Sequence, residues 1–584
     1  MDEIQESLEA NRDRISELPD CIGSYIMSKL TIKDLVTTSV LSKRWLRMWK
    51  LRRNLVFDIP NMFNIDLPPL WEGAGLDIDH EFLDQVTDEY VRRVDQFMQT
   101  FPGPKIDSFR LTHYIDVHKY VSFVDKWVAR AIAMGVEEIA MLSYPSFTTF
   151  YVPKMKRPYS FPFRLLPVCN KKYLKHLYLD SCILMPSSQF FAAFYYLITL
   201  RLEATLVGED FMISLLSNSP FLQGLRLKCC TLPSDLEIVG PSLHHLEVID
   251  CRYKGNVTIS APKLTVFEHR NLLELENILP LNAPQLRKIF FHAWEERMIP
   301  PSISHFTGFA QLEYLNLRMT SGEMPRLPGN IAPLRNLKQL ELSVDERAAL
   351  GCSNILWVVL FLKASPLLQK LTYRRPESPP GFSENERSER WQPEEFTHNQ
   401  LKEVEIAGCV GNWFEVELAI CMLQNVQGLE QMVLNPSQRY YYGGGSWIDD
   451  EQSTCLGAPR YWAKSGREIV VEKLRDKVPG SAKRDMINVL PNDCIESYIL
   501  SKLTIKDLVT PNVLSKTWLR IWKLRRNLIF DIPNMFNVDL PPLRQRSVGK
   551  MVNQQLTDEF VRRVDRFMQT FQGPKTDSFK LTHS

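Results

Sequence analysis

The chain has 584 residues, more than one ordinary compact domain contains, so we expect several domains or a repeat architecture. Its composition, with 24% charged and 45% hydrophobic residues, excludes the disordered and fibrous classes. The formal net charge of +2 at pH 7 does not indicate a nucleic-acid partner.

The first residues, MDEIQESLEANRDR, are polar and acidic, unlike a secretory signal. No uninterrupted apolar stretch approaches the roughly 20 residues that a membrane-spanning helix needs. Eleven cysteines are scattered without a CxxC pair, which favours reduced thiols over a disulfide framework or a zinc site. We therefore expect an intracellular protein, in the cytoplasm and/or the nucleus, with no membrane partner and no bound metal.

The stretch from Leu18 to Trp49 has the pattern of a compact unit of three helices. Helical spacing recurs at both of its ends, first in Ile22, Tyr25, Ile26 and Lys29, then in Leu41, Trp45, Met48 and Trp49. Thr31 followed by Asp34 resembles a capping box that opens the middle helix. A unit of roughly 35–40 residues buries too little surface to be stable alone, so its apolar face must dock on the following domain or on another protein.

Three segments of this stretch, LPDCIGSYIMSKL, TIKDL and TSVLSKRWLRMWK, resemble the F-box of the large plant F-box families. The resemblance implies an F-box at residues 14–55 that binds a Skp-type adaptor and, through it, a cullin-based ubiquitin ligase. The positions that match the family's adaptor-facing pattern are Leu18, Pro19, Ile22, Leu41, Ser42, Trp45 and Leu46. Taken singly, each of these residues is also typical of the core of a helical subdomain.

The next segment alternates short strands with amphipathic helices. Asn54–Asp58 reads as a strand, and apolar spacing predicts helices over Tyr90–Phe101 and Tyr120–Met134. Each helix is followed by the pattern apolar-x-x-apolar-x-apolar, at 106–111 and 136–141, which is the core of a leucine-rich repeat.

That pattern recurs at intervals of about 21 to 33 residues and predicts an irregular leucine-rich-repeat solenoid over residues 100–407. The repeats begin at Leu174, Leu197, Leu222, Leu243, Leu264, Leu286, Leu312, Leu337, Leu368, Leu401 and Leu429. Each strand offers an apolar row that only its neighbours can cover. We therefore expect an α/β fold with a parallel sheet on the concave face and helices outside.

Residues between the buried leucines should point to the concave face and form the client-binding surface. The candidates are His176, Tyr178, Arg201, Arg226, His245, Lys288, Phe290 and Tyr314. Asn316, Glu341, Glu403 and Glu405 continue the series, so the face is expected to grade from basic to acidic. Solvated charges at such positions are also common in any solenoid, whereas exposed aromatics such as Phe290 and Tyr314 more often anchor interfaces.

The end of the repeats resembles the FBD region of plant F-box proteins with leucine-rich repeats. It runs from residue 398 to 440, places a helix at Phe414–Gln424 between two repeat-like strands, and should cap the solenoid. Residues 441–484 read as a linker.

The C-terminal part of the chain repeats its beginning, because Leu490 to His583 match Leu18 to His113 almost word for word. We expect a second F-box at 485–530 and a truncated copy of the following region at 531–584. Pro511, Asn512 and Thr517 depart from the family pattern and speak against adaptor binding by this copy. It is either an inert product of tandem gene fusion, a second functional box, or a segment that caps or blocks the first.

A search for catalytic motifs finds no HExxH, GxSxG, P-loop or GxGxxG after a strand, so we expect a non-catalytic protein without cofactors. Basic and aromatic residues mix near Lys154 and Arg157, but the near-neutral chain favours no nucleic-acid partner. The resemblance implies the substrate-recognition subunit of an SCF-type (Skp-cullin-F-box) E3 ubiquitin ligase that holds an unknown client protein. A non-degradative scaffold and a receptor completed by an anionic small molecule at Arg201 and Arg226 are the alternatives.

Overall fold

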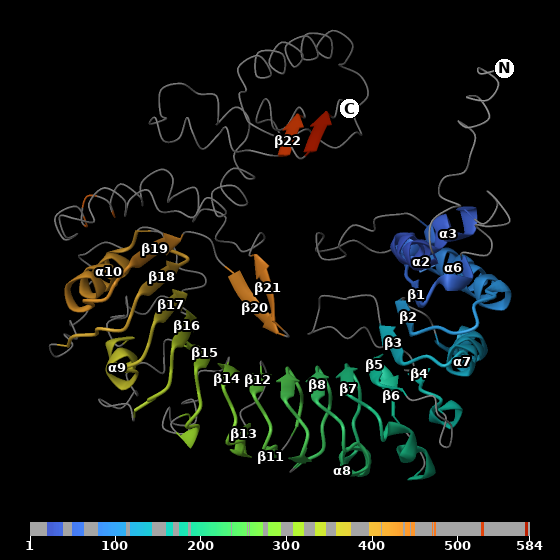
Figure 1. Ribbon diagram of the computed structural model, residues 1–584, viewed down its shortest axis with the longest axis horizontal. Coiled ribbons are helices and arrows are strands. Elements are labelled where there is room, and N and C mark those ends of the chain that lie inside the picture. Colours follow the sequence, from blue (N-terminus) through green and yellow to red (C-terminus); the bar gives the residue numbers. More distant parts are fainter. Residues whose placement is uncertain are drawn as a thin grey trace, which may run out of the picture. The chain divides into compact units, whose positions relative to one another are not determined.

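The fold is described from a computed structural model of the chain (Figure 1). The structure describes residues 20–38, 49–63, 80–112, 117–142, 159–166, 174–184, 188–234, 236–253, 255, 257–271, 278–293, 306, 308–320, 333–345, 358–374, 396–409, 411–435, 439–443, 445–449, 470, 472, 474, 527–530 and 578–581. These residues belong to two units. The first consists of Met1–Ala349, Trp357–Leu371 and Tyr441–Ile448, and the second of Leu350–Leu356, Thr372–Tyr440 and Asp449–Ser584.

The N-terminal helices confirm two elements of the predicted three-helix unit. They are α2 (Asp20–Lys29) and α3 (Ile32–Thr38), followed by the short turn η2 (Trp49–Leu51). Thr31 caps α3, because its Oγ1 accepts a hydrogen bond from the Asp34 amide at 3.0 Å and donates one to the Asp34 carboxylate at 2.8 Å. The predicted third helix begins outside the described residues. Six of the seven adaptor-facing candidates also lie outside them, namely Leu18, Pro19, Leu41, Ser42, Trp45 and Leu46.

Arg52 joins these helices to the first strand of the sheet. Its guanidinium Nη1 donates to the carbonyl of Leu30 at 2.7 Å and to that of Met27, and its Nε donates to the carbonyl of Asn54 at 2.6 Å. Arg52 is only 4% exposed, and this burial lowers its pKa. One buried cation therefore satisfies carbonyl groups at the end of α2 and at the start of β1.

Three strands and two long helices open the solenoid. The strands are β1 (Asn54–Phe57), β2 (Ser108–Thr112) and β3 (Glu138–Leu142), and the helices are α6 (His80–Thr100) and α7 (Val117–Ala133), with the short α5 (Ile59–Phe63) before them. Both helices begin before the predicted start. Their apolar stripes cover the strands through an aromatic cluster in which Phe97 contacts Trp49, Phe57 and Phe101, with ring centroids 5.3 to 5.6 Å apart.

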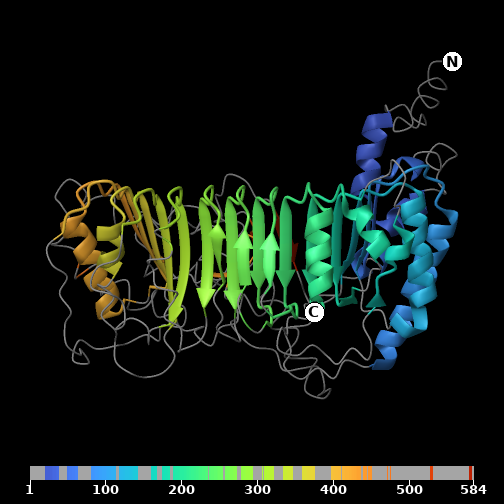
Figure 2. The same ribbon diagram turned by 90° about the horizontal axis from the view of Figure 1, so that it is seen from below.

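The predicted repeats form parallel strands in the first unit, each paired with the strand of the next repeat. They are β5 (His176–Asp180), β7 (Thr199–Glu203), β8 (Gly224–Lys228), β10 (His245–Ile249), β12 (Val266–Asn271), β14 (Lys288–Ala293), β15 (Tyr314–Thr320) and β16 (Gln339–Asp345). Figure 2 shows them side by side. The strands pair in step, so that Leu177, Leu200, Leu225 and Leu246 form one buried row. This row is the core that stacking creates.

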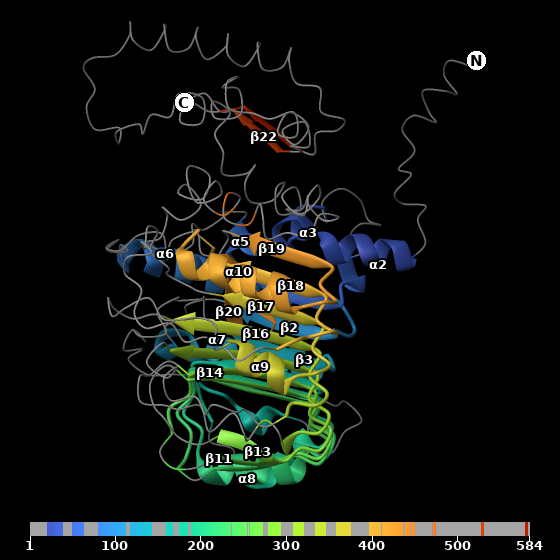
Figure 3. The ribbon, with the colours of Figure 1, turned by 90° about the vertical axis from the view of Figure 1, so that its left-hand side faces the viewer.

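The outer side of the first unit carries elements that the repeat pattern does not predict. A second small parallel sheet consists of β9 (Glu237–Val239), β11 (Val257–Ser260) and β13 (Ile278–Asn282). It lies with α8 (Glu209–Asn218) opposite the concave side, as Figures 1 and 3 show. Smaller elements nearby are β4 (Tyr159–Ser160), β6 (Cys182–Ile183), η3 (Phe163–Leu165) and η4 (Ser188–Phe194), and α9 (Val358–Ala364) follows β16.

Four successive strands end in the same unusual backbone conformation. The residue after β5, β7, β8 and β10 has a positive φ of 49° to 53°, and these residues are Ser181, Ala204, Cys229 and Asp250. Residues other than glycine rarely adopt this left-handed backbone conformation. The amides of these four residues each donate to a carbonyl near the end of the strand in the next repeat, which fixes the turn. The acceptors are Glu203, Lys228, Ile249 and Arg270.

The strand β17 (Lys370–Arg374) begins in the first unit and ends in the second. The second unit then contains β18 (Glu403–Ala407), α10 (Trp413–Asn425) and β19 (Gln431–Asn435), so the helix predicted at 414–424 is confirmed. Asn412 and the buried Glu415 form a capping box at its start, in which Glu415 Oε2 accepts from the amides of Gly411 and Asn412 at 2.8 and 2.9 Å. A helix between two parallel strands matches the expected arrangement of this segment.

The C-terminal copy repeats one structural feature of the original. Strands β22 (Asn527–Phe530) and β23 (Ser578–Leu581) pair in parallel with Asn527 opposite Ser578, just as β1 and β2 pair with Asn54 opposite Ser108. Residues 485–526, including Pro511, Asn512 and Thr517, lie outside the described residues, so the second F-box stays a prediction.

A β-hairpin occupies the beginning of the range predicted as a linker. It is formed by β20 (Arg439–Gly443) and β21 (Ser446–Asp449), and we call it the aromatic hairpin. Aromatic residues on both sides of a glycine run, YYYGGGSW, favour such a hairpin, and the linker over residues 441–484 stays a prediction. Within the described residues, no helix has the length and apolar character required to span a membrane.

Candidate functional site

The N-terminal helices expose large apolar side chains. Ile22 is 43% exposed, Tyr25 in the next turn of α2 is 65% exposed, and Val36 on α3 is 45% exposed. On the opposite side of the same helices Met27 and Leu35 are fully buried. One face thus packs on the chain while the other exposes apolar area, which is the arrangement expected of a docking unit.

The strand register places three rows of side chains on the outward, concave side of the sheet. The middle row is the most complete and runs through Tyr178, Arg201, Arg226, Glu247, Glu268, Phe290, Asn316 and Glu341. The row before it contains His176, His245, Lys288 and Tyr314. All eight predicted client-binding residues therefore lie on this face, on six strands of the sheet, with β12 between them carrying none of the eight.

At the N-terminal end of the face the predicted residues contact one another. The guanidinium of Arg201 lies over the ring of Tyr178, 4.9 Å from its centroid, and a ring nitrogen of His176 lies 2.7 Å from the hydroxyl of Thr199. Burial lowers the pKa of His176, so it is neutral near pH 7. Arg226 is engaged by Glu247, so the alternative of an anionic small molecule held by the two arginines gains no support.

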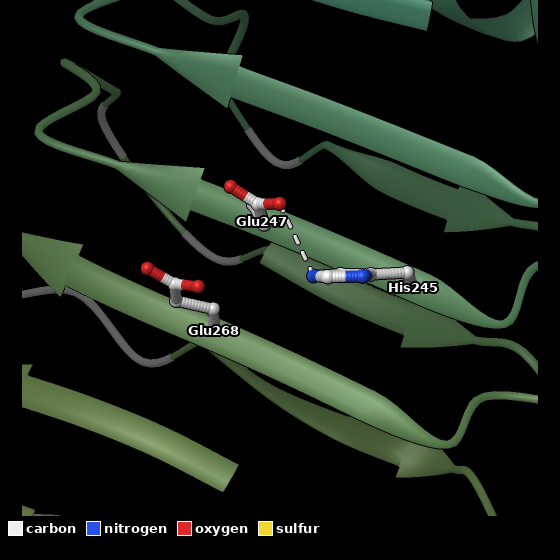
Figure 4. Close-up of side chains that lie close together, drawn as sticks. All are labelled: His245, Glu247 and Glu268. Atoms are coloured by element: carbon white, nitrogen blue, oxygen red, sulfur yellow. Dashed lines mark ion pairs between the residues drawn. The ribbon is translucent and has the colours of Figure 1, made fainter. Parts of the chain in front are cut away.

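The centre of the face contains a cluster that the prediction missed, formed by Glu247 and Glu268 next to His245 (Figure 4). His245 Nε2 lies 3.1 Å from Glu247 Oε1, and Arg226 Nη1 lies 3.2 Å from Glu247 Oε2. Burial alone would raise the pKa of Glu247, but the close contact with His245 and the charge of Arg226 together hold it below its ordinary value. Glu247 is therefore ionised at neutral pH although it is buried.

The same three residues could in principle hold a metal ion, because their ligand atoms lie within 4.8 Å of one another. Each carboxylate already has a partner, however. Arg226 contacts Glu247, and the hydroxyl of Tyr441 donates to Glu268 Oε2 at 2.8 Å. We therefore assign the cluster to the three rows on the concave side, which we call the recognition face, and not to a metal centre.

Aromatic rings follow the acidic cluster. Phe290 and Tyr314, two of the three aromatic candidates, have ring centroids 5.0 Å apart on neighbouring strands. In the last row of the same face, His292 Nε2 lies 2.9 Å from Asn316 Oδ1. Burial lowers the pKa of His292 to about 3 and that of His269 to about 4, so both rings are neutral.

The expected gradient from basic to acidic is not what the face shows. Glu247 and Glu268 directly follow Arg226 in the middle row, and the last of the three rows carries Arg270 and Arg318 further along. Arg270 Nε donates to Asp250 at 3.1 Å, which fixes one of these later cations in an ion pair. Side chains of both charges are therefore mixed along the face in the first unit.

The missed acids occupy a position that the repeat pattern defines. Glu247 in LHHLEV and Glu268 in LTVFEH stand in the same place as Arg201 in LITLRL, between the last two buried residues of the motif. The signal was thus present in the sequence. By contrast, nothing local in the sequence places Tyr441 on this face.

Comparisons with known proteins agree with this architecture. Residues 98–488 match the family model described as At1g61320/AtMIF1, LRR domain, and residues 15–57 match that of the F-box domain. The chain is 31% identical to the F-box/LRR-repeat protein At3g26922 of Arabidopsis thaliana over 47% of this chain and 81% of the relative. It is 25% identical to the F-box/FBD/LRR-repeat protein At2g04230 (62% and 74% covered) and 23% identical to the F-box/FBD/LRR-repeat protein At1g13570 (73% and 91% covered), both from the same plant.

Proposed function

Because the chain belongs to the plant F-box proteins with leucine-rich repeats, we propose that it is the substrate-recognition subunit of an SCF-type E3 ubiquitin ligase. Proteins that combine these two parts have a substrate-recognition role in such ligases in general, and they are typically non-catalytic adaptors. In this proposal the F-box binds a Skp-type adaptor, and the solenoid binds a client protein. Ubiquitin transfer then follows from proximity, without bond chemistry by this chain.

The observation that supports the proposal most is the pairing of two surfaces in the first unit. The apolar face of Ile22, Tyr25 and Val36 is exposed on the F-box helices, and a built polar and aromatic face lies on the strands. Arg52 links the F-box helices to the sheet through three backbone carbonyls. A rigid connection of this kind would hold a client at a fixed place relative to the adaptor.

We also propose that the C-terminal copy does not serve as the adaptor-binding box. Pro511 lacks a backbone donor and restricts Thr510 away from helical geometry, and Thr517 replaces the arginine found at Arg44. The chain would then act through one box, at residues 14–55.

The duplication offers an internal control for testing both statements in the full chain. Leu18→Ala with Pro19→Ala should abolish pull-down of a purified Skp-type adaptor, whereas Leu490→Ala with Pro491→Ala, the matching change in the copy, should leave it intact. Loss of binding in both variants, or in the second alone, would contradict the assignment of the first box. No binding by the unmodified chain would leave a solenoid scaffold as the function.

A further inference from the structure

The aromatic hairpin places one tyrosine, Tyr441, on the recognition face, although the hairpin is far in the sequence from the strands that form this face. The ring of Tyr441 stacks on Phe290 with centroids 4.7 Å apart and an angle of 13° between the planes. Its edge faces His292 at 5.6 Å, and Trp447 of the same hairpin packs against it at 5.1 Å. Tyr441 is 5% exposed, so its side chain is enclosed by these contacts, and Figure 1 shows the hairpin on the concave side of the strands.

The hydroxyl of Tyr441 uses both of its hydrogen-bonding capacities. It donates to Glu268 Oε2 at 2.8 Å and accepts from the amide of Gly445 at 2.9 Å. Glu268 is only 2% exposed, so this carboxylate is buried where the phenol meets it. Burial raises the pKa of Tyr441, which keeps the phenol protonated as a donor.

The backbone of the hairpin approaches the strands as closely as the side chain does. Gly443 has a φ of +105°, and a Cβ at this position would lie 2.7 Å from Ile249 Cδ1 and 3.0 Å from Glu268 Oε1. Only glycine suits both the conformation and the space. The recognition face therefore contacts both the side chain of Tyr441 and the backbone of the same strand at Gly443, where no side chain is present.

We propose that Glu268, Phe290 and His292 form a binding site for an unmodified tyrosine side chain presented by an extended polypeptide, and that the aromatic hairpin occupies this tyrosine site in cis. This inference rests on the proposed role of the solenoid as a client receptor, and it names the client by its chemistry. A client segment with a tyrosine would displace the hairpin from the site. The hairpin is thus a ligand built into the chain.

The chemistry of the tyrosine site predicts its selectivity. A phenylalanine retains the stacking on Phe290 but leaves the buried Glu268 carboxylate without the donated hydrogen bond, which carries a large penalty. A phosphotyrosine would bring two negative charges against Glu268 and towards Glu247, so the carboxylates would repel it. The site therefore selects tyrosine over both relatives, and phosphorylation of Tyr441 would release the hairpin.

The test uses the full chain and a fluorescent peptide with the sequence of residues 437–451, SQRYYYGGGSWIDDE. A tethered segment acts at an effective concentration on the order of 1 mM, so the unmodified chain should bind the peptide weakly or not at all up to that concentration. The Tyr441→Ala chain has lost its own occupant and should bind the peptide at least about tenfold more tightly. Tyr195→Ala, a tyrosine change on an exposed residue elsewhere in the first unit, should behave like the unmodified chain.

Further arms locate the site and measure its selectivity. Phe290→Ala or Glu268→Gln, added to Tyr441→Ala, should remove the gained binding. In the peptide, phenylalanine in place of the tyrosine at 441 should weaken binding by about tenfold or more, and phosphotyrosine or alanine should abolish it. Equal binding by the unmodified and Tyr441→Ala chains, no binding by Tyr441→Ala, or a gain that survives Phe290→Ala would each overturn the proposal.

A second measurement covers the case in which Tyr441→Ala does not fold. Because Gly445 donates to the phenol oxygen, its amide should exchange with solvent slowly in the unmodified chain and at least about tenfold faster in Tyr441→Phe, which keeps the ring. Fast exchange of this amide in the unmodified chain would show that the cis contact does not exist. Adaptor pull-down is independent of these readouts, so failure of the ligase proposal is distinguishable from failure of the tyrosine site.

Discussion

Arg226 and Glu247 face each other across neighbouring strands, with Nη1 and Oε2 3.2 Å apart and the carboxylate buried. The pair lies at the centre of the recognition face, in its middle row. Its two charges come from equivalent positions in successive repeats, because Arg226 and Glu247 are register partners. Neighbouring repeats are thus linked by side chains as well as by the backbone ladder.

Breaking this pair should destabilise the solenoid through the carboxylate that remains. Arg226→Ala leaves Glu247 buried with His245 as its nearest described partner, and we expect a loss of about 1–3 kcal/mol in the free energy of unfolding. Urea denaturation measures this loss. The double change Arg226→Ala with Glu247→Ala should recover part of it, and no recovery would show that the two charges do not interact.

The exposed side of the F-box helices should bind the adaptor without contributing to folding. Ile22→Asp is expected to reduce adaptor binding at least about tenfold, because it puts a charge in the centre of an apolar interface, while the thermal unfolding midpoint stays nearly unchanged. Ile213→Asp is a matched control, since Ile213 is an isoleucine on α8 with 51% exposure. Equal loss in both variants, measured by titration calorimetry, would contradict the assignment.

Arg52 should hold the F-box helices on the sheet. Arg52→Ala removes donors from the carbonyls of Met27, Leu30 and Asn54, and we expect local opening of α2 to become easier by about 1–3 kcal/mol. Hydrogen exchange of the α2 amides reports this opening. The adjacent Arg53 is exposed and provides the control, because Arg53→Ala should leave the exchange rates unchanged.

The buried histidines make stability depend on pH. His269 and His292 have pKa values of about 4 and about 3 in the folded chain, below the ordinary value of about 6.5 in the unfolded chain. The unfolded chain therefore binds more protons between these values, so stability is complete above about pH 6.5 and falls as the pH drops towards 4, by at most about 1.4 kcal/mol per pH unit for each histidine.

His292→Asn should flatten this dependence. In urea denaturation from pH 6.5 to 4.5, the decline in the free energy of unfolding should be smaller in the variant than in the unmodified chain. His244→Asn changes an exposed histidine next to the same sheet and should leave the slope as it was. An unchanged slope in His292→Asn would show that this ring is not buried and neutral.

Much of the fold could be predicted because its information is local and repeated. Each strand that the repeat pattern predicts begins two residues after a predicted leucine, since the apolar pattern of one repeat is sufficient to define its strand. These strands are β5, β7, β8, β10, β12, β14, β15, β16, β17, β18 and β19. The outer strands β9, β11 and β13 could not be predicted, because they carry no repeating signal and depend on packing against one another. The helices α6 and α7 were predicted too short at their N-termini, although Phe82, Leu83 and Val86 already continue the apolar spacing of α6.

The candidate site was predictable only where its residues belong to one repeat pattern. Phe290 and Tyr314 were found from their places between buried residues, and Glu247 and Glu268 were available from the same reasoning. Tyr441 was not, because its contacts with Glu268 and Phe290 join segments 173 and about 150 residues apart, and no periodicity spans such a distance.

The left-handed residue that follows β5, β7, β8 and β10 separates changes in the length of a repeat from changes in the side chains on the recognition face. Ser181, Ala204, Cys229 and Asp250 turn the backbone at the same point of these four repeats, although the number of residues before the next strand differs from one repeat to the next. Insertions and deletions are thus absorbed on the outer side and do not shift the rows of the recognition face. A repeat can therefore become longer or shorter without changing the side chains on the recognition face. Single residues of the middle row can likewise be exchanged without changing the backbone of the sheet.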